Sequence, residues 1–528
     1  MIPFPRAARP AVLALAVCLA SASGAGAAPR SAPLPSLAEI LARYASALDG
    51  PGLSRPLRFE VSGVLHGSGL SGTFHTWRDG DRERDDQELG PRSERMVRIG
   101  ESIAVLDSDG NVRVLRGTLL RRARTEEAIE SGAFLRSPGD CTLRGTQHIA
   151  GREAYVLDVN VPGGELETLS IDTQTNLPVR IEYDFYDGRE TIDVSDWRTV
   201  GGHRFPFRTV SSDGDRAFDT IAEIGAVAID PPIDAALFAP LRGRTLEARA
   251  VQTLKLVERD GHLFVPVQIG ENIYSFLIDS GAQNIVLDSA IARAHSLAEE
   301  GTLEAAGVAR TGGLRVARLP ELGIGAAVLR DLVVSTLDFS RSTGGAMRID
   351  GILGYPFFAA SIVRLDAANR TLTFGPPGTL EPHGTRIDLE LDRRLPEARL
   401  RLNGAVDGLF VVDTGNAGEL LLYRPFVDAH PGLVPVTTTA RRAWGIGGST
   451  TSYASVLDTL DLEDISLFNT PADVMLSTHG AFADRIDAGN VGLGILRKFV
   501  ATFDFGASAL YLERGPGFDD GHNRTVAR

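Results

Sequence analysis

The sequence predicts a mainly β protein, in which an N-terminal antiparallel sheet with one helix is followed by two similar β-rich lobes. Three observations indicate this. Short runs with alternating polar and apolar residues, separated by DG and GG turns, fill residues 57–240. Glycine is abundant, with 57 residues, as strand-and-turn proteins require. Residues 250–516 contain two stretches of similar sequence. A chain of 528 residues is also long enough for two or three domains.

The first 27 residues have the composition of a secretory signal peptide. Arg6 and Arg9 precede the apolar run AVLALAVCLA, and the small residues SASGAGAA follow it. We expect cleavage near Ala27 and a periplasmic or secreted protein. The only cysteines are Cys18 and Cys141, so the mature chain would hold no internal disulfide. Export without disulfides is typical of a bacterial envelope protein that its core alone stabilises.

Charge and motif content exclude several classes of function. The net charge is 54 − 68 = −14, which argues against a nucleic-acid partner because phosphate binding depends on a cationic surface. The histidines form no H-E-x-x-H pair, so we expect no metal and no cofactor. GSGLSG at residues 67–72 matches G-x-G-x-x-G, but the strand-like GTFHTW follows it. It therefore predicts a hairpin turn and not a nucleotide site.

Residues 36–240 form the first predicted domain. SLAEILARYASALD (36–49) has the pattern of an amphipathic helix, and a meander of strands follows. This order, with phrases such as SIDTQTNLPVRIEY and GGHRFPFRT, resembles the half-barrels of Lol-type lipoprotein carriers. The resemblance implies a curved sheet around an apolar groove, and leaves open a lipid or lipoprotein contact through this domain. Residues 230–250, with a proline pair and a polar tail, are predicted to be a linker.

The two similar stretches predict two lobes. VPVQIGENIYSFLIDSGAQNIVLDSAIARAH corresponds to ARLRLNGAVDGLFVVDTGNAGELLLYRPFVDAH, and SIVRLDAANRTLTF corresponds to FVATFDFGASALYLE. The offsets agree closely: 413 − 279 = 134 and 504 − 366 = 138. We expect lobes at 250–380 and 381–516, derived from an internal duplication, and a C-terminal tail at 517–528.

FLIDSGA (276–282) and FVVDTGNAG (410–418) are the candidate catalytic segments. In each, an apolar strand delivers an aspartate, Asp279 or Asp413, to a fixed point. The hydroxyl of Ser280 or Thr414 can hydrogen-bond to the facing loop, while Gly281 and Gly415 allow that loop to approach closely.

Two carboxylates that share a site hold one proton between them. The ionised member can then take a proton from a bound water, and the protonated member can polarise a carbonyl group. This chemistry requires no metal and no covalent intermediate.

With these motifs, residues 250–516 resemble a bacterial two-lobed aspartic protease of the retropepsin-like and pepsin-like kind. The family places an apolar-apolar-Gly element behind each catalytic loop. Ile352-Leu353-Gly354 matches it in the first lobe, and Leu493-Gly494, within Val491–Gly494, in the second. The separations are alike, since 354 − 279 = 75 and 494 − 413 = 81.

The resemblance also implies a flap hairpin that closes over an extended peptide. The Gly-rich stretches GVARTGG (307–313) and WGIGGST (444–450) occupy that place. The flap and substrate-binding candidates are Gly312, Gly313, Trp444, Gly445, Gly447 and Gly448. Since both aspartates belong to one chain, we expect the active site to be complete in a monomer.

Two hypotheses for function follow. The first is an exported aspartic endopeptidase that acts on a peptide or protein substrate. The second is a non-catalytic envelope protein that binds a lipid or a peptide and carries a degenerate protease module. The second is motivated by Asn416, which stands where Ala or Ser is usual in the family, and by flaps that lack the tyrosine typical of pepsins.

Overall fold

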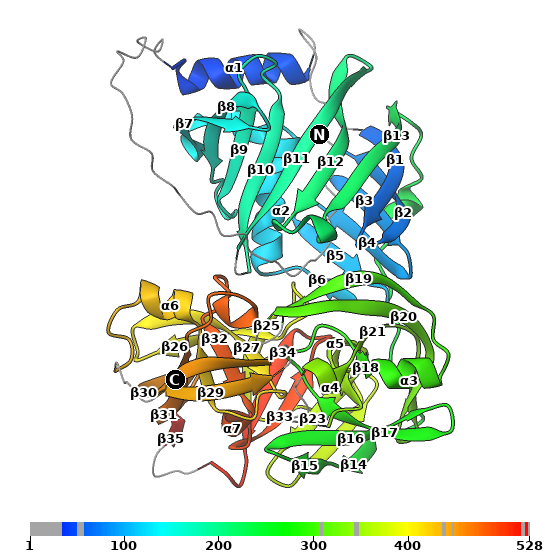
Figure 1. Cartoon of the computed structure of the whole chain (residues 1–528), viewed down its shortest axis with the longest axis vertical. Helices are drawn as coiled ribbons and strands as arrows, with labels where there is room; N and C mark the ends of the chain where they lie inside the picture. Colours follow the sequence, from blue (N-terminus) through cyan, green and yellow to red (C-terminus); the bar gives the residue numbers. More distant parts are fainter. Residues whose placement is uncertain are drawn as a thin grey trace.

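The structure is a computed structural model that describes residues 34–49, 58–186, 188–306, 310–342, 348–435, 440–445, 448–518 and 523–525. The predicted signal peptide, residues 1–27, lies outside these ranges. The mainly β prediction is confirmed: strands dominate both the N-terminal part, at the top of Figure 1, and the C-terminal part below it. None of the described helices has the length and apolar character of a membrane span.

The N-terminal part is built on one antiparallel sheet of thirteen strands. The order is β6-β5-β4-β3-β2-β1-β13-β12-β11-β10-β9-β8-β7, a meander whose first and last strands, β1 and β13, pair in its middle. The strands are β1 (Arg58–Gly67), β2 (Leu70–Asp79), β3 (Arg82–Leu89), β4 (Arg92–Ile99), β5 (Ser102–Leu106), β6 (Val112–Val114), β7 (Cys141–Ile149), β8 (Arg152–Val159), β9 (Glu167–Asp172), β10 (Pro178–Phe185), β11 (Gly188–Val200), β12 (His203–Ser212) and β13 (Thr220–Ile229).

Two helices pack on this sheet. Helix α1 (Leu37–Leu48) begins with a capping box in which Ser36 and Glu39 bond reciprocally. Its buried face, including Tyr44, belongs to the same apolar cluster as Leu157 and Ile171 of the sheet. Helix α2 (Thr118–Glu130) adds Ile129 to that cluster. The sheet with its helix is thus the half-barrel-like arrangement expected, and the helices cover apolar sheet surface that a groove would expose.

The C-terminal part holds two further sheets, of eight and fourteen strands. The first lobe contains β15 (Val257–Arg259), β16 (His262–Ile269), β17 (Asn272–Ile278), β18 (Val286–Asp288), β19 (Glu299–Ala306), β20 (Arg310–Ile324), β21 (Ala327–Leu337) and β22 (Gly351–Leu353), with helices α3 (Ser289–Ala294), α4 (Phe339–Ser342) and α5 (Tyr355–Ala360). The second lobe contains β26 (Glu397–Leu402), β27 (Val406–Asp413), β28 (Leu420–Leu422), β29 (Ala440–Gly445), β30 (Gly448–Leu462), β31 (Ile465–Met475) and β32 (Gly489–Gly492), with helices α6 (Arg424–Ala429) and α7 (Leu493–Leu496).

The two lobes share one pattern of strand pairing. In the first, β17 pairs parallel with β22, β22 antiparallel with β18, and β18 parallel with β21. In the second, β27, β32, β28 and β31 repeat these three pairings in the same order and direction. Asp279 follows the first strand of its set, and Asp413 ends the first strand of the other. Equivalent strands therefore deliver both aspartates.

Six strands join the lobes, in the order β14-β24-β23-β33-β34-β25. They are β14 (Gln252–Lys255), β24 (Thr371–Gly375), β23 (Ile362–Asp366), β33 (Phe499–Asp504), β34 (Ala509–Arg514) and β25 (Thr385–Glu390). At the centre, Ile362 pairs with Asp504 and Asp366 pairs with Val500. Since 500 − 362 = 138 and 504 − 366 = 138, equivalent residues pair reciprocally, as a local two-fold axis requires. In the tail, β35 (Asn523–Thr525) pairs with β31.

The N-terminal domain is fixed to the second lobe by a helix cap. Asp392, which is 1% exposed, accepts hydrogen bonds from four backbone amides at the start of α2, namely those of Arg116, Gly117, Leu119 and Leu120, at 2.7–3.2 Å. The first amides of a helix have no partner within it and carry a positive partial charge. Here the carboxylate of Asp392, from another domain, accepts hydrogen bonds from these amides and supplies the complementary negative charge. This cap ties the sheet domain to the segment immediately before β26.

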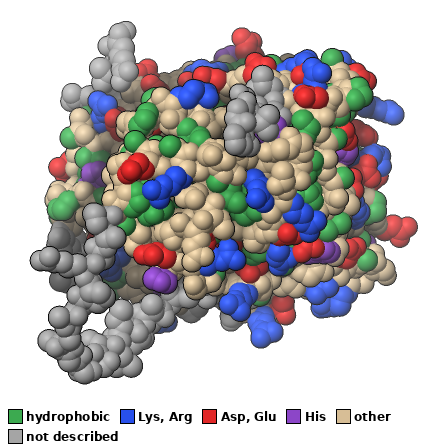
Figure 2. Space-filling view, turned by 90° about the horizontal axis from the view of Figure 1, so that it is seen from above, with side chains coloured by type: hydrophobic (Ala, Val, Ile, Leu, Met, Phe, Trp, Pro, Cys, Tyr) green, Lys and Arg blue, Asp and Glu red, His purple; other side chains and the backbone are tan. Residues whose placement is uncertain are grey.

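The surface of the molecule alternates in charge where Figure 2 shows it. Acidic and basic side chains lie next to one another over this face, with hydrophobic side chains between them. The excess of acidic residues, which gives the net charge of −14, is therefore not gathered into one field on this face. Such a mixed surface favours solubility.

Candidate active site

Two buried strands bring the aspartates to the same place. Phe276, Leu277 and Ile278 of β17 are buried, and so are the apolar residues at the end of β27. Asp279 and Asp413 follow these runs directly. The chain therefore leaves the core at two rigid points, so the carboxyl groups are held by the scaffold and not by mobile loops.

Gly281 and Gly415 let each loop approach the aspartate of the other lobe. A Cβ atom on Gly281 would lie 2.6 Å from Cγ of Asp413, and one on Gly415 would lie 2.4 Å from Cγ of Asp279. Such distances are below any normal contact, so only glycine fits at either position. The reciprocal contacts place both carboxyl groups between the two loops, where they share a hydrogen bond.

The hydroxyl groups lock the loops together in the way the sequence predicts. Ser280 Oγ donates to the Val412 carbonyl at 2.7 Å and accepts from the Thr414 amide at 3.0 Å. Thr414 Oγ1 donates to the Ile278 carbonyl at 3.0 Å and accepts from the Ser280 amide at 3.0 Å. All four bonds cross from one lobe to the other and are buried. They fix the relative position of the two strands.

Asp279 is the member of the pair whose pKa is raised. Burial, with the Asp413 carboxylate beside it, raises the pKa of Asp279 well above the usual range, and the amides of Gly281 and Ala282 only partly oppose this. Its Oδ1 atom is buried and has no hydrogen-bond partner among the described residues. A protonated carboxyl in this position can donate to a substrate group.

Asp413 has the surroundings of an ionised carboxylate. Its Oδ1 accepts from the amides of Gly415 at 2.7 Å and Asn416 at 3.2 Å, and its Oδ2 accepts from Nδ2 of Asn490 at 2.5 Å. Hydrogen bonds to a charged acceptor are shorter and stronger than those to a neutral one. Three donors on one carboxyl group therefore favour the negative charge there.

Asn416, the unexpected residue after the second triplet, orients Asn490. The Gly418 amide donates to Asn416 Oδ1 at 2.8 Å, so the Asn416 NH₂ group must face the other way. It donates to Asn490 Oδ1 at 2.9 Å, which in turn directs the Asn490 NH₂ group at Asp413. Asn416 thus takes part in a connected network at the site.

The register corrects one predicted element. Val412 pairs with Val491 and Asp413 with Gly492, while in the first lobe Ile278 pairs with Leu353. The equivalent of Ile352-Leu353-Gly354 is therefore Asn490-Val491-Gly492. The predicted Leu493 and Gly494 lie two residues further on, in helix α7. Gly492 and Gly494 of GNVGLG can each be aligned with Gly354, so the sequence alone fits either alignment. Asn490 is polar where the motif has an apolar residue, and this made the correct alignment hard to recognise.

The described residues of the predicted flap segments lie in antiparallel strand pairs, while residues 307–309 and 446 lie outside the described ranges. Gly312 and Gly313 lie in β20, which pairs with β19, and a Cβ on Gly313 would meet Thr302 Cγ2 at 2.0 Å. In the second lobe Trp444 pairs with Ser449 and Gly445 with Gly448 across β29 and β30. Gly447 lies outside the described residues. Closure of these hairpins over a substrate stays a prediction.

Residues missed at the sequence level also adjoin the loops. His262 begins β16 and lies beside Gly415 and Asp413; burial lowers its pKa, against the effect of the Gly415 carbonyl. Gln283, four residues after Asp279, donates to the Arg393 carbonyl at 2.7 Å and to Tyr186 Oη at 2.9 Å. Arg393 itself is 1% exposed and pairs with Glu397, Asp484 and Asp487. These residues belong to no recognisable sequence motif, so the sequence alone did not single them out.

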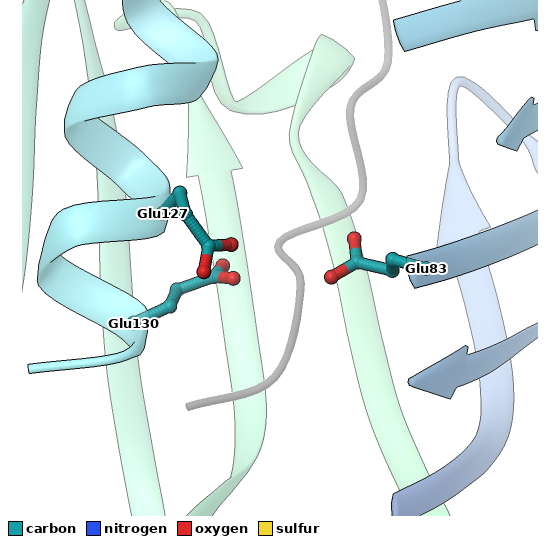
Figure 3. Close-up of side chains that lie close together, drawn as sticks. All are labelled: Glu83, Glu127 and Glu130. Atoms are coloured by element: carbon teal, nitrogen blue, oxygen red, sulfur yellow. The ribbon is translucent and has the colours of Figure 1, made fainter. Parts of the chain in front are cut away.

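One cluster of carboxylates lies apart from this site, inside the N-terminal domain. Glu83, Glu127 and Glu130 offer oxygens within 4.8 Å of one another (Figure 3). Arg98 pairs with Glu83 at 3.2 Å and with Glu127 at 2.8 Å, and Arg78 pairs with both as well. Two guanidinium groups therefore balance most of the negative charge. Buried ion pairing accounts for this cluster without a cation.

Comparison with known proteins agrees with the protease resemblance. Residues 265–357 match the family model described as aspartyl protease. This range includes the first triplet and Ile352-Leu353-Gly354. A search of curated proteins finds no matching sequence. The chain therefore carries an aspartic-protease-like module, as the sequence predicts.

Solved structures similar to the chain fall into two groups. A LolA superfamily protein from Nitrosomonas europaea is 15% identical, with 39% of this chain and 98% of that chain covered and a TM-score of 0.28. A DUF1329 family protein from Desulfovibrio piger is 14% identical, with 38% and 95% covered and a TM-score of 0.28. A retropepsin-like aspartic protease from Rickettsia conorii is 21% identical, with 25% and 92% covered and a TM-score of 0.19. All three TM-scores are below 0.5, so the fold assignment rests on the strand pairings given above.

Proposed function

We propose that the protein is an aspartic endopeptidase that hydrolyses peptide bonds with a water molecule activated by Asp279 and Asp413. One observation carries this proposal: two carboxyl groups from equivalent strands meet across glycines, one with a pKa that burial raises and the other surrounded by N–H donors. One group is thus suited to donate a proton and the other to accept one.

The reaction follows from these two roles. Asp413 takes a proton from the water as its oxygen attacks the peptide carbonyl carbon, and Asp279 donates its proton to the carbonyl oxygen. Collapse of the tetrahedral intermediate breaks the C–N bond, and the leaving amine receives a proton from the dyad. General acid–base catalysis of this kind contributes on the order of 10²–10⁴-fold. All groups belong to one chain, so a monomer suffices.

The substrate would be an extended peptide segment. Hairpins β19–β20 and β29–β30 offer strand edges on which a peptide backbone can pair without its sequence being read. With the signal-like residues 1–27, this supports an exported enzyme that acts on proteins of a bacterial envelope.

The test is cleavage of a peptide library by wild type, Asp279→Asn and Asp413→Asn. Each substitution keeps the shape of the side chain but removes one of the two roles, so we expect turnover to fall at least about 10³-fold. Asp458→Asn, at an exposed position, is the matched control and should keep full activity. A statine-type hydroxyl inhibitor should block the wild type. Undiminished cleavage in either dyad variant would exclude the mechanism.

The second candidate is a protein that binds a lipid or a peptide, and a cavity in the N-terminal domain favours it. The cavity measures about 780 Å³ and lies between the end of α1 and strands β10–β12. Its lining includes Ala47, Leu177 and Trp197 next to Arg152 and Arg204. Vesicle and fatty-acid binding by the Asp279→Asn variant would support this role whether or not cleavage occurs.

A further inference from the structure

The side chain of Gln283 joins the three parts of the molecule. It belongs to the first lobe, and its NH₂ group donates two hydrogen bonds. One goes to the Arg393 carbonyl, between β25 and β26 of the second lobe, at 2.7 Å. The other goes to Tyr186 Oη, in the turn between β10 and β11 of the N-terminal domain, at 2.9 Å. Since a carbonyl can only accept, the NH₂ group and not the side-chain oxygen must face Arg393.

Both acceptors are themselves held in place. The Arg393 guanidinium is buried and pairs with three carboxylates of the second lobe. It also lies 5.0 Å from the centre of the Tyr186 ring. The Tyr186 carbonyl accepts from the Arg485 amide of the second lobe at 2.9 Å. A side chain that bonds to two fixed acceptors is fixed too, so Gln283 anchors the chain segment to which it belongs.

That segment is the turn that carries Asp279. The Ala282 amide donates to the Asp279 carbonyl at 3.3 Å and closes a tight turn, which Gln283 follows directly. The Tyr355 amide donates to the Ala282 carbonyl at 2.8 Å and supports the turn from the other side. Burial raises the pKa of Asp279, and the amides of Gly281 and Ala282 act in the opposite direction. The position of the turn therefore affects both the place and the protonation of the carboxyl group.

The equivalent turn of the second lobe is held differently. It is closed in the same way, since the Asn416 amide donates to the Asp413 carbonyl at 3.4 Å. The next residue is Ala417, which has no polar side chain. The Asn416 side chain bonds to Asn490 and to the Gly418 amide, both of its own lobe. Gln283 thus has no polar counterpart at the matching position of the second lobe.

We infer that Gln283 is a positioning residue of the active site, through which the second lobe and the N-terminal domain hold the turn that carries Asp279. The N-terminal domain is then part of the catalytic unit and not a separate module. The inference rests on the proposed peptidase function and adds to it the way in which the first aspartate is kept in place.

Other titratable groups lie near the turn, and they are common to the proteins compared below. Burial raises the pKa of Tyr186 and that of Tyr355 to about 12, so both hydroxyl groups are neutral at lower pH. Burial also raises the pKa of Glu397 to about 7. A shift that appears only when Gln283 is changed therefore reports the turn. The remaining groups are Asp413, with His262 and Tyr423 beside it, and Arg393, Asp484 and Asp487.

The first test is the pH profile of peptide cleavage by Gln283→Met, which keeps the length of the side chain and removes both donors. We expect kcat to fall about 10–100-fold and KM to change less than about twofold, because the turn is displaced while peptide binding is not. The amides of the turn then favour the ionised Asp279 carboxylate less. The alkaline limb of kcat/KM should therefore move about 0.5–1 pH unit higher. Tyr186→Phe removes one of the two acceptors and should shift the same limb less.

Two matched variants serve as controls. Gln268→Met, in β16 of the same lobe, removes an exposed bond to the Gly270 carbonyl at 2.9 Å. Tyr511→Phe, in β34, removes a hydroxyl group that accepts from Arg386 at 3.0 Å. Both should keep the wild-type profile. A folded Gln283→Met variant with unchanged kcat, or with a lower kcat but an unmoved alkaline limb, would overturn the inference. An unmoved limb in Tyr186→Phe would overturn the part assigned to the N-terminal domain.

The second test is independent of catalysis. The unfolding free energies of wild type and Asp279→Asn, compared at several pH values, follow the titration of the aspartate pair without a substrate. Wild type loses stability relative to Asp279→Asn as pH rises toward the raised pKa of the folded state. With Gln283→Met added to both proteins, this loss should continue about 0.5–1 pH unit higher.

The outcomes of the two tests separate the two proposals. Absence of cleavage by wild type together with this shift in unfolding would overturn the enzyme proposal and keep the role of Gln283. Absence of the shift would overturn the role of Gln283 whether or not the protein cleaves peptides. Thermal unfolding shows which variants are folded, and if Gln283→Met is not, Tyr186→Phe replaces it in the same comparison.

Discussion

Asp279 and Asp413 leave equivalent strands and meet equivalent hydroxyl and glycine neighbours, yet the residue on the strand behind each one differs. Leu277 pairs with Ile352 in the first lobe, whereas Val411 pairs with Asn490 in the second. The Asn490 amide bonds to Asp413, and an isoleucine side chain offers Asp279 no such donor. A nearly symmetric scaffold thus brings two carboxyl groups together, and one polar replacement gives Asp413 a hydrogen-bond donor that Asp279 lacks.

The largest expected effect comes from crowding the symmetric contacts. Gly281→Ala and Gly415→Ala should each lower kcat/KM at least about 100-fold, since a Cβ would lie 2.6 Å or 2.4 Å from the facing carboxyl carbon and displace it. Steady-state peptide cleavage measures this. Gly139→Ala, where a Cβ meets nothing within 4 Å, is the control. If either active-site variant kept more than half of the activity, the two loops could not be as close as described.

The inter-lobe hydrogen bonds of Ser280 and Thr414 are equivalent, so the two hydroxyl groups should contribute equally to the stability of the protein. Ser280→Ala and Thr414→Val each leave a buried amide and a buried carbonyl without a partner, so the free energy of unfolding should fall by about 2–4 kcal/mol in each. Denaturant unfolding measures it, with the exposed Thr253→Val as control. Losses that differ between the two variants by more than about 2 kcal/mol would show that the lobes do not share the lock equally.

Asn490, the residue that breaks the symmetry between the two lobes, should affect the pH dependence of kcat/KM. Asn490→Ile copies the first lobe and removes a donor from the Asp413 carboxylate, so kcat/KM should fall about 10–100-fold. The charged form of that carboxylate is less favoured without the donor, so activity should be lost at a higher pH as the solution is acidified. The side chain of Asn416 acts on Asp413 only through Asn490, so Asn416→Ala should shift the acidic side of the pH profile less than Asn490→Ile does. An unmoved acid limb in Asn490→Ile would contradict the assignment of Asp413 as the base.

The smallest effect concerns stability against pH. The raised pKa of Asp279 means that the folded protein keeps a proton that the unfolded chain loses near pH 3.9, so stability falls as pH rises between the two values, by about 1.4 kcal/mol per unit. Asp279→Asn lacks this titration and should become more stable than wild type on going from pH 3 to pH 7.

The other buried acids do not blur this comparison. Burial raises the pKa of Asp109 to about 6 and that of Glu397 to about 7, but both contribute equally to the two proteins. The difference in unfolding free energy, measured at several pH values, therefore reports the titration of the Asp279–Asp413 pair. A difference that does not change with pH would contradict a protonated Asp279.

The sequence was most informative where function depends on local pattern. The two triplets, their buried strands and the glycines behind them are consecutive residues, so their roles can be predicted from spacing and residue type. Asn490 was missed because it replaces an apolar residue in a motif recognised by its apolar character. Tyr186 was missed for another reason: its contacts join segments almost 100 residues or more apart, in different domains, and no local pattern encodes them.

The cap that Asp392 places on α2 has a consequence for the order of assembly. The amides it binds precede it by 272 to 276 positions in the chain. During synthesis the start of α2 therefore waits, without its acceptor, until more than two thirds of the polypeptide has been made, and Asp413 follows only after that. Such long-range closure makes folding slow, and it delays assembly of the two-aspartate site until most of the chain has emerged.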